Sequence, residues 1–494
     1  MKQFVAPFFF ISLIGLSCVR NENSHQLLIA NHPRHESLDS LINAYVEWYR
    51  PIGFAIGIID KGKLIYAKGF GVQNIEDKRP VTPGSVFHMA SVSKLVATTG
   101  IMQLFEKRQL DIDSTVVHYL PYFTMDDSRY KDITIRHILT HTSGIPDVED
   151  EEDYGWEQPE YDSDAAERFV KSLATRKLRF TPGEKRSYSN NAFNILPDVV
   201  SKVTGMSFEE YMETYVFRPL NMNHTTFLKE DVSEEHATSP HEISGRNLNF
   251  IVSPVYPYSR KSTASSNLHT SIEDMCAFSL ALLNGGSYDD TQILDASTIE
   301  RMGNERLGSR GYWEFQGHKA LSHSGNVRGF NSYFIVLPAD SIAVVAMSNC
   351  DHFLCTDVSQ AAIKILFGEE PEPLRPALSM AFYESVRTRG IEQAIDSLRY
   401  WLETNKDQYK IDWDNIWFLG WRSIQQGQHD VAIKLYKYWY ELWPNSIITP
   451  YCLGKAYMQK GDDKSAAMYF QRVLDADPEY VRARMYLEQL QRRE

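Results

Sequence analysis

The chain lacks the features that mark several large classes of protein. Its net charge is −13, so it has no surplus of lysine and arginine for binding nucleic-acid phosphates. It has only 5 cysteines in 494 residues, with no Cys-x-x-Cys pair and no spacing typical of metal ligands. His137 and His141 are four residues apart but lack the glutamate of a His-Glu-x-x-His zinc motif. We therefore expect no nucleic-acid partner, no metal and no cofactor. Cys350 and Cys355 could form a disulfide in an exported protein, or both could be buried free thiols.

The N-terminus has an apolar run that is too short to span a membrane. Lys2 precedes this run at residues 5–16, which is the order of an export signal. Residues 1–18 therefore predict a periplasmic or cell-envelope protein, with residues 19–36 as a polar tether. The Gly-Leu-Ser-Cys that ends at Cys18 resembles a bacterial lipobox with its leucine one place off. Cys18 would carry a lipid anchor, or the signal would simply be cleaved.

The chain does have a serine and a lysine three residues apart where an apolar helical pattern begins. Residues 87–94 predict a turn that leads into a helix, with Ser91 and Lys94 on one face. Backbone N–H groups at a helix N-terminus favour developing negative charge, and a neutral amine beside a hydroxyl can activate it as a nucleophile. The pattern alone is weak evidence, because Ser128 and Lys131 repeat it.

Two further motifs support Ser91. Tyr188-Ser189-Asn190 is the only Tyr-x-Asn in the chain, and His323-Ser324-Gly325 is the only His-Ser/Thr-Gly. With Ser-x-x-Lys, their order resembles the serine β-lactamase and penicillin-binding-protein superfamily. The branch most resembled is that of class C β-lactamases, D-Ala-D-Ala carboxypeptidases and family VIII esterases. Residues 139–146, Leu-Thr-His-Thr-Ser-Gly-Ile-Pro, are similar to a segment of that branch, and the resemblance covers residues 36–368.

The resemblance implies a role for each motif residue. Ser91 would attack a carbonyl and become the acyl-enzyme, while Lys94 and Tyr188 would share the proton transfers; which of the two is the base stays open. Asn190 would donate to the substrate amide. The backbone N–H groups of Ser91 and Asn326 would form the oxyanion hole.

The third motif departs from the commoner β-lactamase form, which has lysine in place of His323. Ser324 and Gly325 belong to a strand expected to run along the substrate, and Gly325 would let the acyl chain approach the backbone. Histidine is only partly charged near neutral pH, so a substrate carboxylate should bind less well. This favours esters, amides or D-amino peptides over β-lactams. Arg328 would replace the missing charge or be a solvated turn residue.

The order of apolar patterns predicts an α+β domain over residues 37–368. An antiparallel sheet flanked by helices would be interrupted by a helical subdomain, with the site in the crevice. The acidic segment 147–160 is expected to be a solvated loop, with a lid over the site as the alternative. The strands are expected at residues 55–60, 64–70, 320–324, 330–337 and 342–348.

The last part of the chain repeats itself. After a Pro/Glu-rich linker at residues 369–376, residues 377–494 show a period of 34 residues, for example from Gly420 to Gly454. This pattern resembles tetratricopeptide repeats, and a degenerate earlier copy near Gly390 would make three. The many tryptophans would pack in the core or line a groove for a peptide.

Together these features predict an exported serine hydrolase that cleaves an ester, amide or D-amino peptide. The alternative within the superfamily is a D,D-carboxypeptidase or β-lactamase. A rival of another class is a catalytically silent protein that binds peptidoglycan fragments while its repeats recruit a protein partner. The repeats could also be a stabilising appendage without a partner. Since all three motifs are intact, the silent protein is disfavoured.

Overall fold

The computed structural model describes residues 29–148, 154–244, 249–350, 355–411, 413–478 and 480–492. The predicted export signal and Cys18 lie outside these residues. Of the predicted tether, only residues 29–36 are described. Helix α1 already begins at His35, and the Ala30 N–H donates to the Leu64 carbonyl at 2.8 Å. Within the described ranges, no helix is long and apolar enough to cross a membrane.

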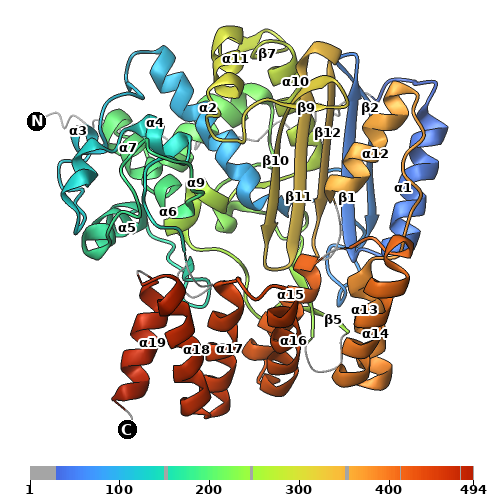
Figure 1. The fold of residues 1–494 in the computed structure, drawn as a ribbon. Helices are drawn as coiled ribbons and strands as arrows, with labels where there is room; N and C mark the ends of the chain where they lie inside the picture. The colour runs from blue at the N-terminus through green and yellow to red at the C-terminus, as the bar shows by residue number, and fades with distance from the viewer. Residues whose placement is uncertain are drawn as a thin grey trace, which may run out of the picture.

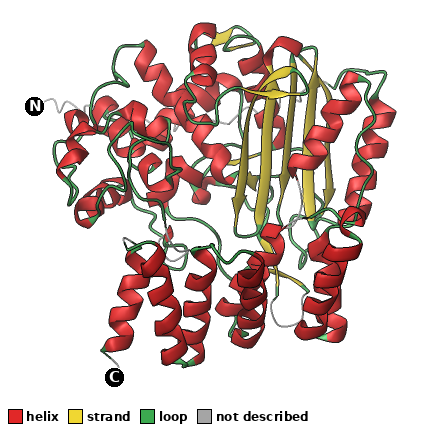
Figure 2. Cartoon of the chain, in the orientation of Figure 1, coloured by secondary structure: helices red, strands yellow, loops and turns green. Residues whose placement is uncertain are grey.

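An antiparallel sheet forms the centre of the first domain (Figures 1 and 2). Its six strands lie in the order β2-β1-β12-β11-β10-β9, so the first and last parts of the domain meet in one sheet, as the sequence predicted. The strands are β1 (Gly53–Asp60), β2 (Lys63–Gly71), β9 (Trp313–Phe315), β10 (His318–Val327), β11 (Phe330–Leu337) and β12 (Ile342–Ser348).

Helices cover both faces of this sheet, so its central strands are buried and mostly apolar. Every residue of β1 and of β12 is buried. Helices α1 (His35–Tyr49) and α12 (Cys355–Phe367) pack on one face, and α10 (Ile272–Leu283) packs on the other. Gly57 of β1 meets α10 closely, because a Cβ there would lie 2.4 Å from the Cys276 sulfur.

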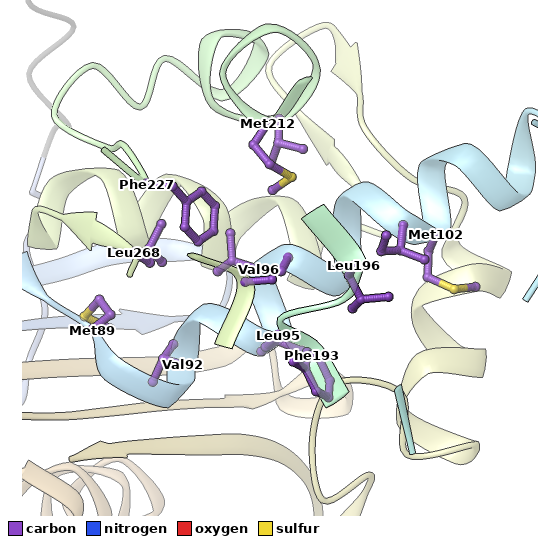
Figure 3. Packing of buried hydrophobic residues seen from close by; sticks show 14 of the residues in the cluster. Met89, Val92, Leu95, Val96, Met102, Phe193, Leu196, Met212, Phe227 and Leu268 are labelled. Carbon is purple, nitrogen blue, oxygen red and sulfur yellow. The ribbon is translucent and has the colours of Figure 1, made fainter. Parts of the chain in front are cut away.

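A helical subdomain stands beside the sheet, and its core surrounds helix α2 (Ser93–Glu106) (Figure 3). Residues 190–204 form two helices, because the chain turns before Pro197, which lies in the first turn of the second. The other helices of this domain are α3 (Val116–Tyr119), α4 (Ile135–Leu139), α5 (Ala165–Ser172), α6 (Asn190–Phe193), α7 (Leu196–Thr204), α8 (Phe208–Met212), α9 (Thr263–Ser266) and α11 (Ala296–Asn304). Three short strand pairs complete it: β3 (Phe87–His88) with β6 (His269–Thr270), β4 (His241–Ile243) with β5 (Phe250–Val252), and β7 (Ser287–Tyr288) with β8 (Thr291–Gln292).

The C-terminal part is all-helical and lies in a row below the first domain in Figure 1. Its geometry fits the repeat seen in the sequence. Gly420 packs on the Tyr436 ring, and Gly454, 34 residues later, packs in the same way on the Phe470 ring. A Cβ at either glycine would lie within 2.7 Å of that ring. The helices are α13 (Leu378–Arg389), α14 (Ile391–Thr404), α15 (Trp413–Gln425), α16 (His429–Leu442), α17 (Ile448–Lys460), α18 (Asp463–Ala476) and α19 (Val481–Gln491).

The two parts share a small hydrophobic core. Ile243 and Phe250, from strands β4 and β5 of the first domain, pack against residues of helices α13 to α16, including Leu378, Phe382 and Leu435. Figure 1 shows β5 beside these helices. The C-terminal helices therefore contact the first domain through buried side chains as well as through the linker.

Candidate active site

Ser91 lies in a 3-10 turn (Ala90–Val92) that leads directly into α2. The residue before it, Ala90, has a positive φ of 48°, which is a strained backbone conformation for a residue with a Cβ. Strand β10 presses against this turn: a Cβ on Gly325 would lie 2.2 Å from the Met89 carbonyl oxygen and 2.3 Å from the Ser332 hydroxyl. Close packing of β10 on the Ser91 turn therefore requires a glycine here, and the predicted access for an acyl chain stays a prediction.

Lys94 is fully buried and its amine points at Ser91. Its Nζ lies 3.2 Å from the Ser91 hydroxyl, 2.6 Å from the Asn190 side-chain oxygen and 2.6 Å from the Ser265 carbonyl oxygen. Burial lowers the pKa of Lys94 to about 7, against the opposite pull of the Asp147 charge. A lysine with this pKa has a large neutral fraction near neutral pH, so it can accept a proton.

Tyr188 approaches Ser91 from the other side. Its hydroxyl donates to the Ser91 oxygen at 2.9 Å, and burial raises the pKa of Tyr188, so this hydroxyl keeps its proton at neutral pH. The buried His141 ring stacks on the Tyr188 ring at a centroid distance of 4.2 Å, and its Nδ1 accepts from the Ser189 N–H at 3.2 Å. His141 is thus a support for the Tyr-x-Asn segment.

Sequence reasoning missed Asp147. Its carboxylate accepts from the Asn190 backbone N–H at 2.6 Å and from the Asn190 side-chain Nδ2 at 3.3 Å, and burial raises its pKa. The same Nδ2 also donates to the Tyr154 hydroxyl at 3.1 Å. Both amide hydrogens of Asn190 are therefore directed at protein atoms in this structure, although the sequence predicted a donor to substrate. The position of Asp147, directly after the Leu-Thr-His-Thr-Ser-Gly-Ile-Pro segment, was the available signal.

The segment predicted as a solvated loop is a wall of the site where it is described. Besides Asp147, its Tyr154 contacts Asn190 and stacks on Trp156 at a centroid distance of 4.6 Å, and Trp156 is buried. These aromatic rings bury apolar surface, so they hold the segment against the domain. The expectation of a solvated loop is wrong for these residues.

Strand β10 places the His-Ser-Gly motif beside this cluster. The half-buried His323 ring contacts the Ser324 carbonyl oxygen through Nδ1 at 2.7 Å. Burial, and then the Lys94 charge, lower the pKa of His323 to about 3, so the imidazole is neutral at pH 7 and not partly charged as predicted. Ser324 and Asn326 alternate with His323 and Gly325 and are exposed. Because Gly325 packs on the turn that carries Ser91, the backbones of Asn326 and Ser91 belong to adjoining segments.

Neither prediction for Arg328 is correct. Its side chain is 7% exposed and its Nε lies 2.7 Å from the fully buried Glu242 carboxylate, so it is neither solvated nor available to substrate. Other arginines surround His323. Arg186 and Arg310 both act to lower the pKa of His323, and Arg310 and Arg306 act in the same direction on the pKa of Arg186. None of these three forms an ion pair in the described part of the chain.

The other groups that the sequence offered as candidates do not belong to this cluster. Ser128 and Lys131, the second Ser-x-x-Lys, lie in a 3-10 turn that contains no buried residue. Cys350 and Cys355 are buried free thiols, which is one of the two alternatives left open by the sequence. The residues that the structure describes contain no cluster of His, Cys, Asp and Glu that could hold a metal ion.

A sheet of this topology, with helices on both faces and a helical subdomain beside it, is the fold of the serine β-lactamases and penicillin-binding proteins. The sequence agrees with the fold. The profile described as Beta-lactamase matches residues 38–364, and the chain belongs to that family.

Individual relatives support the same assignment. The chain is 25% identical over 320 residues to Protein flp of Staphylococcus aureus (strain MW2), an alignment that covers 64% of this chain but only 63% of that protein's length. It is 28% identical over 347 residues to Penicillin-binding protein 4* of Bacillus subtilis (strain 168), covering 64% of this chain and 73% of that one. Among solved structures, the octameric penicillin-binding protein homologue from Pyrococcus abyssi is similar, with a TM-score of 0.59 and 26% identity over 68% of this chain and 78% of that chain.

Proposed function

We propose that the protein is a serine hydrolase that forms an acyl-enzyme on Ser91 and hydrolyses it with water. The observation that carries this proposal is the placement of the Ser91 hydroxyl between the Lys94 amine, at 3.2 Å, and the Tyr188 hydroxyl, at 2.9 Å. Membership of a family of serine hydrolases supports the same chemistry.

The two neighbours of Ser91 have complementary proton states. Neutral Lys94 takes the Ser91 proton as the Ser91 oxygen bonds to the substrate carbonyl carbon. Tyr188 keeps its proton at neutral pH and can pass it to the leaving group, so the bond to that group breaks without releasing a strong base. The proton held by Lys94 then returns to Tyr188 through water, because the Ser91 oxygen is now part of the ester. In this scheme Lys94 is the base in acylation, and the reverse transfers activate water in deacylation.

The oxyanion is assigned to the backbone N–H groups of Ser91 and Asn326. The support is that strand β10 packs on the Ser91 turn at Gly325, one residue before Asn326. Donors fixed in a packed backbone need no reorganisation when negative charge develops on the substrate oxygen. Ser324, exposed on the same strand, is then free to contact substrate.

The arginines near His323 favour a substrate that carries a carboxylate. Since His323 is neutral at pH 7, the positive field at this end of the site comes from Arg310 and Arg186 together with whatever charge Lys94 keeps. This observation favours the D,D-carboxypeptidase alternative, in which a free carboxylate lies next to the scissile amide, over hydrolysis of neutral esters. The fold and the family do not identify the leaving group, so the choice between an amide and an ester is part of the proposal.

Covalent labelling tests the nucleophile and paired substrates test the specificity. A fluorescent penicillin or fluorophosphonate should label the wild type and not Ser91→Ala, read as a shift in intact mass, whereas Ser128→Ala should label normally. Equal labelling of Ser91→Ala would refute the assignment.

Peptides ending in D-Ala-D-Ala should be cleaved faster than the same peptides with an amidated end, and nitrocefin and p-nitrophenyl esters serve as the reference substrates.

Export and lipid attachment are separate proposals that rest on residues 1–18. A palmitate analogue supplied to growing cells should label the wild type, and Cys18→Ala should lose the label. If the mature N-terminus is found at another residue, anchoring through Cys18 is refuted while export stands.

A further inference from the structure

A second cluster of buried charges lies where the two parts of the molecule meet. Glu242 of strand β4 has a fully buried side chain. Arg328 reaches it with two nitrogens, Nε at 2.7 Å from one carboxylate oxygen and Nη2 at 3.2 Å from the other. Arg422 of helix α15 lies on the other side, with its Nη1 3.6 Å from the carboxylate, and Ser253 donates to it at 3.0 Å. The side chains of both arginines are only 7% exposed.

The arginine on the catalytic side is attached to the active-site strand. Strand β10 ends at Val327, so Arg328 is the first residue of the turn that follows, two residues after Asn326. The next residue, Gly329, packs on the segment before β4, because a Cβ there would lie 2.4 Å from Pro240. The turn after β10 therefore contacts the β4 segment in two ways: Gly329 packs against Pro240, and Arg328 forms an ion pair with Glu242.

The arginine on the other side belongs to the C-terminal helices. Gln426, the first residue after α15 and four residues after Arg422, also reaches Glu242 with its amide, at 3.5 Å. Alongside this contact, Ile243 of β4 and Phe250 of β5 are packed among the C-terminal helices. Glu242 is thus held from both sides within a region that excludes water.

We propose that Arg422 is a positioning residue for the active site, through which the C-terminal helices fix the end of strand β10. A buried carboxylate needs charged partners in place, and loss of one partner leaves an uncompensated charge that the surrounding segments must move to solvate. Here the segments free to move are β4 and the β10–β11 turn that bears Arg328. Because β10 supplies the Asn326 backbone to the oxyanion hole, such a movement misplaces a catalytic donor. The inference rests on the proposed function in this last step.

The kinetic test compares Arg422→Met with Arg399→Met in the full-length chain. Arg399 is a matched control, since it also pairs with a glutamate on the C-terminal helices, Glu441, but in an exposed position. Acylation by a p-nitrophenyl ester, measured well below the thermal transition of each variant, should be at least about tenfold slower in Arg422→Met and unchanged in Arg399→Met. The fall should appear in kcat more than in KM, because the misplaced group acts on the transition state.

A readout that does not need Ser91 chemistry separates this inference from the proposed function. Hydrogen exchange of the amides in residues 321–330 should be faster in Arg422→Met than in the wild type or in Arg399→Met, and unchanged exchange would refute the inference even in a protein that no probe labels. A lowered melting temperature with native acylation and native exchange would also refute it, since that is the result of a merely structural role.

Arg422→Lys keeps the test decisive if Arg422→Met fails to fold. Lysine retains the charge but not the planar fork of the guanidinium, so we expect intermediate acylation, about threefold below the wild type, and intermediate exchange in residues 321–330. Wild-type values for both quantities in a folded Arg422→Lys, together with a failure of Arg422→Met to fold, would assign Arg422 to folding alone and overturn the proposal.

Discussion

The molecule contains two buried clusters of opposite charges that are built differently. In the crevice, the Lys94 amine and the Asp147 carboxylate are separated by the neutral amide of Asn190, which accepts from one and donates to the other. At the junction with the C-terminal helices, Glu242 contacts Arg328 directly. Burial shifts the pKa values of Lys94 and Asp147, the separated pair, toward their neutral forms. Glu242 and Arg328, the direct pair, stay charged.

The directions of the pKa shifts express this difference. Burial lowers the pKa of Lys94 to about 7, and the opposite effect of the Asp147 charge is too small to offset it. Burial alone would raise the pKa of Glu242, but the hydrogen bond from Arg328 and the charge of Arg422 outweigh it, so the net shift is downward. A reactive amine has to be able to lose its charge, and a structural carboxylate has to keep it. The neutral Asn190 amide between Lys94 and Asp147 allows the amine to lose its charge, and direct contact with Arg328 keeps Glu242 charged.

The largest effect should follow from making the reactive cluster permanently charged. Lys94→Arg places a guanidinium that cannot lose its proton at the Ser91 hydroxyl, so acylation should fall on the order of 10²- to 10⁴-fold, the range for loss of a general base. Stopped-flow release of p-nitrophenol from a p-nitrophenyl ester measures acylation, and Lys131→Arg in the surface Ser-x-x-Lys serves as control. Native acylation in Lys94→Arg would leave Tyr188 as the base.

The converse change removes the charge from the structural cluster. Glu242→Gln leaves two buried arginines without their carboxylate and should destabilise the protein on the order of 3–5 kcal/mol, measured by chemical denaturation at pH 7. The lowered pKa means that Glu242 contributes its stability fully above its unfolded pKa, about 4.3, and loses it as the pH falls through the lower folded value. The difference in stability between wild type and variant should therefore shrink under acid conditions. A difference that is the same at pH 7 and at pH 3 would show that the ion pair is not its source.

Asn190→Asp should turn the separated pair into a direct one. In the wild type, kcat/KM should rise about tenfold per pH unit below pH 7 and level off above it, because only neutral Lys94 accepts the proton. An aspartate at position 190 would stabilise the charged amine, raise the pKa of Lys94 and move this profile to higher pH, with a loss of about tenfold at pH 7. A lower plateau with an unmoved profile would instead mean that Asn190 acts on the substrate.

The smallest effect concerns the exposed arginines at the His323 end of the crevice. Arg186→Gln should lower kcat/KM about three- to tenfold for a peptide with a free terminal carboxylate and leave the amidated peptide unchanged, as expected for one charge-assisted contact. Steady-state kinetics on the two peptides give the comparison. An equal loss on both peptides would place Arg186 in support of Tyr188, two residues away.

The parts of the fold that sequence predicted are those defined by local signals. Strands β11 and β12 begin and end where their apolar runs meet a turn, and Ser91, Lys94 and Tyr188 come together as the order of their motifs implied. The predicted export signal lies outside the described residues and stays a prediction. What sequence missed depends on partners far away in the chain. No sequence pattern near Arg328 indicates that it pairs with Glu242. The acidic composition of the segment after Asp147 predicted a solvated loop, although Trp156 in that segment is buried.

The sharing of Glu242 between the two parts has a consequence for how the protein is made. Glu242 and Gln426 are separated by 184 residues, so a growing chain exposes β4 and the β10–β11 turn long before α15 has been synthesised. Until then the charge of Glu242 has only its nearer partners, and the end of β10 lacks its final support. Under the proposal for Arg422, the end of β10 therefore gains its last support only after α15 has been synthesised, and a chain that stops before α15 contains Ser91, Lys94, Tyr188 and Asn326 without that support.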